Sequence, residues 1–117
     1  MFISEIARLL DAEIVVGGEK PDLEVSAAFS SDLMSDVLAY VREGTLLITG
    51  LVSPHTIRTC EMLDTRAVVF VRGKQVPEEV RTLAEENGMR ILTTKLSMYE
   101  TSGILWQNNL AGEVLHE

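Results

Sequence analysis

The residues of this chain that could do chemistry lie in short polar clusters that follow strand-like apolar runs. The clusters are Ser30-Ser31-Asp32, Thr49-Gly50, Arg72-Gly73-Lys74 and Thr93-Thr94. The runs before the last three are continuously apolar, as is typical of strands that are buried on both faces of a parallel sheet. In an open α/β sheet, ligands bind outside the carboxyl ends of the strands. The clusters therefore predict where a ligand would bind, without identifying it.

We expect a small-molecule ligand to contact polar residues at strand ends and helix starts, namely Ser30, Asp32, Thr49, Gly50, Ser53 and Thr93. Ser53-Pro54 is a typical helix start, and the free N–H groups of a helix N-terminus favour an anion. An anionic or nucleotide-like ligand fits these features, whereas Asp32 and the net charge of −8 disfavour a highly charged one. Neither Gly-x-x-x-x-Gly-Lys-Ser/Thr nor Gly-x-Gly-x-x-Gly occurs in the chain.

Each of these clusters also has a purely structural explanation. Ser and Asp are favoured N-caps, so Ser30-Ser31-Asp32 is explained by a helix that begins after it. Gly50 is explained by a turn of the chain. Arg72-Gly73-Lys74 is the only compact positive cluster, and it fits a polar turn as well as a holder of phosphate or carboxylate.

Catalysis has one candidate pair, Asp32 with His55, which would act as a small hydrolase or transferase. That chemistry requires the two side chains to meet at hydrogen-bond distance in one cleft. Cys60 has no nearby His in sequence and lies on an apolar helical face, so we expect a core residue rather than a nucleophile. Two isolated His and one Cys lack metal-ligand spacing. We therefore expect no enzymatic activity, no metal and no cofactor.

The elements that must position these residues alternate along the chain as α-β-β-α-β-α-β-α-β-α. This order predicts a three-layer α/β domain with a mainly parallel sheet and helices on both faces. The runs 46–49 and 67–71 are the most apolar and should form the central strands. We expect one domain over residues 1–110, with a last helix running to about Leu110, and a frayed tail over residues 111–117.

Composition excludes several functional classes. Only 10 Lys and Arg stand against 18 Asp and Glu, which disfavours nucleic acid as a partner. The longest apolar stretches are far shorter than the roughly 20 residues of a membrane span, so we expect no membrane association. The single Cys60 rules out an internal disulfide and favours a reducing compartment, which predicts a cytoplasmic protein.

The stretch 28–39, followed by Leu46-Leu47-Ile48-Thr49-Gly50, resembles the DRTGG domain family, and residues 91–101 resemble that family's closing strand and helix. Asp32 matches the aspartate of the family motif and Thr49-Gly50 its Thr-Gly, whereas Leu51 stands where a second glycine is expected. The resemblance implies a fold similar to the N-terminal domain of HPr kinase/phosphorylase. It also implies a domain that accompanies phosphotransacetylases and nucleotide-sensing CBS proteins without being their catalytic part.

From the resemblance we expect a non-catalytic regulatory or ligand-sensing module that self-associates as a homodimer. The candidate surfaces for the homodimer are the helix of His55 and the helix of Trp106. The second is a candidate because Trp is enriched at interface hot spots. Core packing explains Trp106 equally well. The main alternative is a pure interaction module, whose apparent pocket is filled by its own side chains or by a protein partner.

Overall fold

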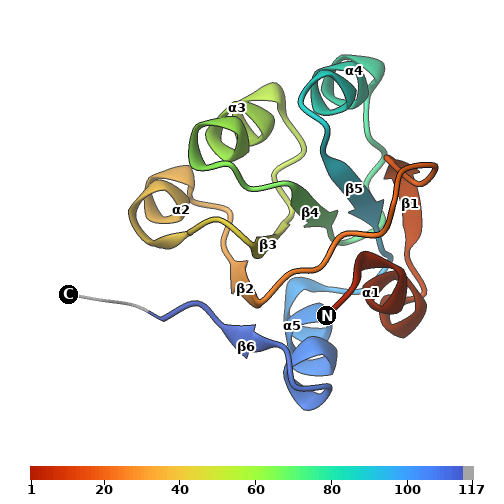
Figure 1. Ribbon diagram of the computed structural model, residues 1–117, viewed down its shortest axis with the longest axis vertical. Coiled ribbons are helices and arrows are strands. Elements are labelled where there is room, and N and C mark those ends of the chain that lie inside the picture. Colours follow the sequence, from red (N-terminus) through yellow and green to blue (C-terminus); the bar gives the residue numbers. More distant parts are fainter. Residues whose placement is uncertain (115–117) are drawn as a thin grey trace.

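The computed structural model describes residues 1–114 and shows a six-stranded sheet between two layers of helices (Figure 1). The helices are α1 (Ile3–Leu10), α2 (Met34–Tyr40), α3 (Pro54–Leu63), α4 (Glu78–Glu86) and α5 (Met98–Gln107). The strands are β1 (Glu13–Val16), β2 (Ala27–Ser30), β3 (Thr45–Thr49), β4 (Ala67–Phe70), β5 (Arg90–Thr93) and β6 (Ala111–Gly112). The three-layer α/β prediction is confirmed.

The strands lie in the order β1-β5-β4-β3-β2-β6. Strands β2 to β5 pair in parallel, β6 pairs in parallel with β2, and β1 is antiparallel to β5. The predicted central strands are confirmed as β3 and β4, and every residue of both is buried. Their continuous apolar sequence follows from this position, because helices cover both faces of a parallel sheet.

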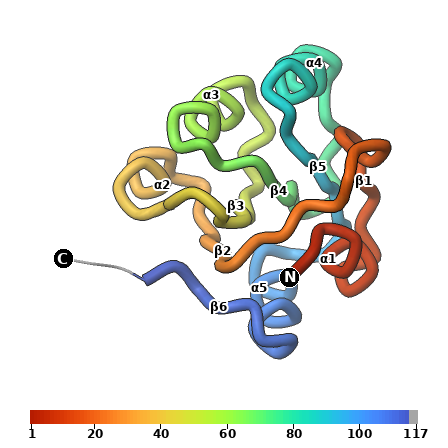
Figure 2. Tube along the Cα trace, viewed as in Figure 1, coloured from red at the N-terminus to blue at the C-terminus, as the bar shows by residue number. Residues whose placement is uncertain are grey.

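The two helical layers bury separate cores on the two faces of the sheet. Helices α2, α3 and α4 cover one face, and α1 and α5 cover the other (Figures 1 and 2). Leu47 and Phe70 belong to the first core, and Leu46 and Val69 to the second, because neighbouring residues of a strand point to opposite faces. None of the helices in residues 1–114 is long and apolar enough to cross a membrane.

Two helices begin at the N-caps that the sequence predicts, and a third does not. Ser53 accepts a hydrogen bond from the N–H of Thr56, and Ser97 forms a capping box with Glu100. In contrast, Leu33 is the N-cap of α2 and no side chain caps that helix. The capping explanation for Ser30-Ser31-Asp32 is therefore wrong, and these side chains have other partners.

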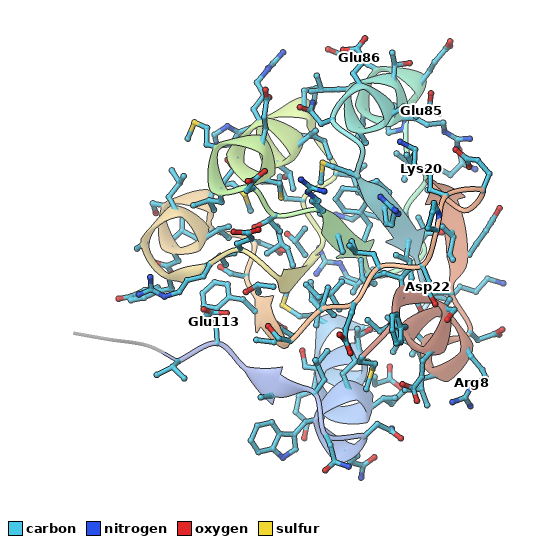
Figure 3. All side chains as sticks on the ribbon, viewed as in Figure 1. Arg8, Lys20, Asp22, Glu85, Glu86 and Glu113 are labelled. Atoms are coloured by element: carbon cyan, nitrogen blue, oxygen red, sulfur yellow. The ribbon has the colours of Figure 1, made fainter. Side chains whose placement is uncertain are left out.

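The end of the domain also differs from the expected frayed tail. Helix α5 stops at Gln107, and Ala111–Gly112 form β6 against the edge of β2. Glu113 then donates its N–H to Ala28 O at 2.9 Å, and its carboxylate Oε2 accepts a hydrogen bond from Thr45 Oγ1 at 2.6 Å (Figure 3). Strand pairing and hydrogen bonds to the sheet thus hold residues 111–113, while residues 115–117 lie outside the described part of the chain.

Candidate functional site

Asp32 connects the carboxyl ends of two neighbouring strands. It lies just after β2, and its Oδ1 accepts hydrogen bonds from Gly50 N at 2.7 Å and Thr49 Oγ1 at 2.9 Å. The backbone hydrogen bond from Gly50 is the main cause that lowers the pKa of Asp32, with Thr49 and Arg72 adding to it against the opposing effect of burial. Asp32 is therefore a carboxylate at neutral pH, and its charge is stabilised by fixed donors.

Two cations from the loop after β4 reach the same place. Arg72 Nη2 lies 3.7 Å from Asp32 Oδ2, and Lys74 Nζ donates a hydrogen bond to Gly50 O at 2.5 Å. The guanidinium group of Arg72 also occupies the space that a Cβ on residue 50 would need. We call Asp32, Thr49, Gly50, Arg72 and Lys74 the edge cluster. Because Gly50 has no Cβ, the Arg72 side chain can lie directly against its backbone.

The loop that carries the two cations is held in a fixed conformation. Arg72 and Gly73 both have left-handed backbone angles, with φ of 68° and 66°. Their N–H groups donate to Leu96 O at 2.8 Å and to Thr94 O at 2.9 Å, respectively. A left-handed conformation is uncommon for a residue other than glycine, so these two bonds to the segment after β5 explain how Arg72 keeps it.

Ser53 and His55 begin α3, directly after the edge cluster in sequence. The Ser53 hydroxyl is already used as the helix cap, at 3.4 Å from Thr56 N. His55 is exposed, and within residues 1–114 no hydrogen bond or ion pair joins it to Asp32. The oxygens of Asp32 face Gly50, Thr49 and Arg72 instead, so the structure does not bring the candidate catalytic pair into contact.

Ser30 and Thr93 lie apart from the edge cluster. Ser30 Oγ is 2.7 Å from Ser102 Oγ of α5, on the face of the sheet that α1 and α5 cover. Thr93 ends β5, and the whole of β4 separates it from β3. Of the six predicted ligand residues, the structure joins Asp32, Thr49 and Gly50 by hydrogen bonds and places Ser53 just beyond them.

Thr93 lines a pocket of about 580 Å³ at the carboxyl end of β5, with both charged and apolar residues in its walls. Its charged lining residues come from the end of α1, the start of β1, the loop after β4, helix α4 and the loop after β5. They are Asp11, Glu13, Lys74, Arg81 and Lys95. We call this the β5 pocket. Lys74 belongs to both the pocket and the edge cluster, so the two are adjacent.

Trp106 lies on the other side of the sheet, in an open groove of about 730 Å³ between α5 and the β2–β6 edge. Its side chain is 70% exposed, and that of Tyr99 on the same helix is 88% exposed. Among residues 1–114, Glu100 is the only charged residue that lines this groove. His55 is on α3, across the sheet from α5, so the two predicted interface residues lie on opposite faces.

Arg72 and Lys74 are the site residues that sequence reasoning did not include among the ligand contacts. Their signal was present as the compact positive cluster after a buried strand. What the sequence could not show is that this loop folds back over Gly50. Within residues 1–114, no group of three or more His, Cys, Asp or Glu is arranged to hold a metal ion.

Comparison with known proteins identifies the family. The model of the DRTGG domain matches residues 5–107. The chain belongs to the DRTGG domain family. This confirms the resemblance carried by Asp32 and Thr49-Gly50. No curated protein sequence matches the chain.

A solved structure shows the same fold for this DRTGG domain. It is a crystal structure of the CBS and DRTGG domains of the regulatory region of Clostridium perfringens pyrophosphatase, complexed with the activator diadenosine tetraphosphate. The TM-score is 0.77 at 16% sequence identity, and the match covers 95% of this chain and 50% of that chain. The chain thus spans about half the length of its structural neighbour, and at this identity the likeness establishes the fold alone.

Proposed function

We propose that this DRTGG domain is a non-catalytic regulatory module that senses a small anionic or nucleotide-like ligand at the carboxyl edge of its sheet. The observation that carries the proposal is the convergence of Arg72 and Lys74 on Gly50, next to the start of α3. The structural neighbour supports it, because its DRTGG domain belongs to a regulatory region that was crystallised with a nucleotide activator.

The edge cluster has unused capacity for an anion. Arg72 has five N–H donors and is 47% exposed, and its ion pair with Asp32 is at one nitrogen. Lys74 has three donors, of which one is used on Gly50 O. An anion can therefore bind at the cluster without displacing Asp32 from Gly50. The same carboxylate limits how much negative charge the ligand can bring, because like charges repel at close range.

The non-catalytic part of the proposal rests on Asp32 and His55. A general base must reach the proton that it abstracts. Asp32 is engaged by Gly50 and Thr49, and its lowered pKa makes it a weak base. A hydrolase or transferase would require turnover that Asp32→Asn and His55→Ala abolish equally, and we expect no turnover to be detected.

Ligand binding is tested by thermal shift on the wild-type chain with diadenosine tetraphosphate, ATP, AMP and inorganic phosphate. A ligand at 100 times its Kd should stabilise the fold by about 2.7 kcal/mol, which is several degrees in a domain of this size. Arg72→Ala should reduce the shift, whereas Arg8→Ala should not, because Arg8 is an exposed residue of α1 that pairs with Glu5 and points outward from the molecule (Figure 3). No shift with any probe would contradict the proposal.

Self-association is a second proposed property, favoured by the exposed Trp106. Two copies that each carry −8 repel one another, so they would meet best through a face with little charge, such as the α5 groove. Light scattering on Trp106→Ala should show a smaller mass than wild type. The control is Leu33→Ala, because Leu33 is also exposed, at 57%, and lies on neither of the two candidate helices. A wild-type monomer at high micromolar concentration would contradict the homodimer and leave a protein partner as the occupant of the groove.

We also propose that the module works in a reducing compartment such as the cytoplasm. Cys60 is the only cysteine of the chain, and it is fully buried in the core under α3. A fluorescent fusion that reports its position in the cell would test this. Secretion of the fusion would contradict it.

A further inference from the structure

We propose that the β5 pocket binds the ligand of this domain, and that this ligand is a phosphorylated metabolite that also carries hydroxyl or amino groups. Sugar phosphates and nucleotides share this chemistry. The inference rests on the proposed function, which it deepens by naming a site and a ligand class. Its starting point is the unusual distribution of charge around the pocket.

The pocket concentrates cations in an acidic chain. Lys74, Arg81 and Lys95 line it, which is three of the ten Lys and Arg of the protein. Asp11 and Glu13 line it as well. None of these five charges takes part in the ion pairs found within residues 1–114. Charges of both signs thus surround one cavity without neutralising each other, which leaves them available to a ligand.

The carboxylates determine what the ligand must carry besides an anionic group. Glu13 is paired in register with Thr93, so both side chains lie on the same face of the sheet. Asp11 ends α1 with a left-handed backbone and lines the same pocket. Ionised carboxylates only accept hydrogen bonds, so the ligand must donate to them from hydroxyl or amino groups. A simple polyanion lacks such donors and would be repelled.

The size and walls of the pocket fit a small metabolite. Its volume of about 580 Å³ lies within the range of small-molecule sites. Val15, Val76 and Leu96 add apolar surface to the lining, which suits the less polar part of a ligand. The loop that carries Lys74 is fixed to the segment after β5 through Gly73 N and Thr94 O, so the backbone at this wall of the pocket is held in place before the ligand arrives.

Lys74 connects this pocket with the edge cluster. Its Nζ donates to Gly50 O, and the residue also lines the pocket. A phosphate in the pocket would bind the donors of the Lys74 ammonium group that Gly50 O leaves free, and would draw that group toward the pocket. Ligand binding would therefore change the contacts of Gly50, whose N–H donates to Asp32. This gives the regulatory module a physical route from its ligand to the loop before α2.

The test is calorimetric titration of the wild-type chain with four probes: inorganic phosphate, adenosine, ribose 5-phosphate and AMP. We expect the two phosphorylated sugars to bind at least tenfold more tightly than phosphate or adenosine alone. Equal affinity for ribose 5-phosphate and AMP indicates a sugar phosphate, and a preference for AMP indicates a nucleotide. Phosphate that binds as tightly as AMP would overturn the inference, because the carboxylates would then have no role.

Variants separate this inference from the proposed function. Arg81→Ala and Glu13→Gln should each weaken binding of the tighter probe at least tenfold. Their controls are Arg8→Ala and Glu86→Gln, which remove similar charges at exposed positions outside the pocket (Figure 3). Wild-type affinity in both pocket variants, together with loss in Arg72→Ala, would overturn the β5 pocket and leave the edge cluster as the site. No binding by wild type to any probe would overturn both.

Discussion

The Oδ1 atom of Asp32 accepts a hydrogen bond from the backbone N–H of Gly50 at 2.7 Å. This contact continues the pairing of β2 and β3 beyond their last register pair, Ser30 with Ile48. A hydrogen bond to an ionised acceptor is stronger than one between neutral groups. It therefore holds the loop between β2 and α2 in place. Helix α2 itself has no side-chain cap at its start.

Asp32→Asn should lower the free energy of unfolding by about 1 kcal/mol at pH 7, because it weakens a charged hydrogen bond at a half-exposed site. The effect should depend on pH. The pKa of Asp32 is lowered in the folded state from its ordinary value of 3.8, so the carboxylate stabilises the fold fully above that value and less as the pH falls through the folded pKa. Urea unfolding of both proteins between pH 2.5 and 7 should show their difference shrink below about pH 4.

The matched control for that series is Asp64→Asn. Asp64 ends α3 with a left-handed φ of 57°, which Asn also tolerates, and it is exposed. We expect a change within about 0.5 kcal/mol for this surface substitution. A pH profile of Asp32→Asn that runs parallel to wild type down to pH 2.5 would show that the charge of Asp32 is not the stabilising feature.

Gly50→Ala should move Arg72 rather than unfold the protein. Gly50 lacks the left-handed backbone that would exclude alanine, and the obstacle to a Cβ is the end of the flexible Arg72 side chain. We expect a cost of about 1 kcal/mol in wild type, from the lost Asp32 ion pair and repacking. In an Arg72→Ala background the same substitution should cost much less. A double-mutant cycle by urea unfolding measures this coupling, and equal costs in both backgrounds would refute it.

Cys60 should resist thiol reagents in the folded protein. It is 0% exposed, and burial raises its pKa to about 12, so very little reactive thiolate forms at neutral pH. We expect modification by a chromogenic disulfide to be slow at pH 8 and complete within minutes in denaturant. Rapid stoichiometric modification of the native protein would show that α3 opens readily or packs differently.

Two leucines of the chain offer a test of the core. Leu47 is in the middle of β3 and 0% exposed, whereas Leu33 precedes α2 and is 57% exposed. Leu47→Ala should cost about 2–5 kcal/mol, as large-to-small changes in a packed core do. Leu33→Ala should cost less than about 1 kcal/mol. Thermal unfolding of the pair provides the comparison, and similar melting temperatures would contradict the assignment of β3 as a central strand.

The fold could be predicted well from the sequence because its signals are local or periodic. The continuous apolar character of 46–49 and 67–71 placed β3 and β4 at the centre of the sheet. The serine caps at Ser53 and Ser97 marked two helix starts. Strand β6 carries no such signal, because it has only two residues and depends on the edge of β2 and on the contact of Glu113 with Thr45.

The site could be predicted only in part, because its contacts join distant segments. Proximity to a strand end indicated Asp32, Thr49 and Gly50. Local propensity also favours a cap at Ser30-Ser31-Asp32, and this prediction is wrong because all three side chains have other partners. Ser30 contacts Ser102, Ser31 accepts a hydrogen bond from Leu33 N, and Asp32 accepts one from Gly50 N. For Arg72 the sequence allows a polar turn or a holder of phosphate or carboxylate. It does not predict the left-handed backbone of Arg72, because that conformation depends on the distant hydrogen bond to Leu96 O.

The two edges of this sheet, β1 and β6, differ in stability. Strand β6 contributes two exposed residues, and the Thr45–Glu113 hydrogen bond is one of the few contacts that fasten it. Such a segment opens locally at a small fraction of the energy that global unfolding requires. Amide protons of β6 and of the adjoining side of β2 should therefore exchange with deuterated water within a short time. Those of β3 and β4 should exchange only when the whole molecule unfolds, so exchange would proceed across the sheet from this edge inward.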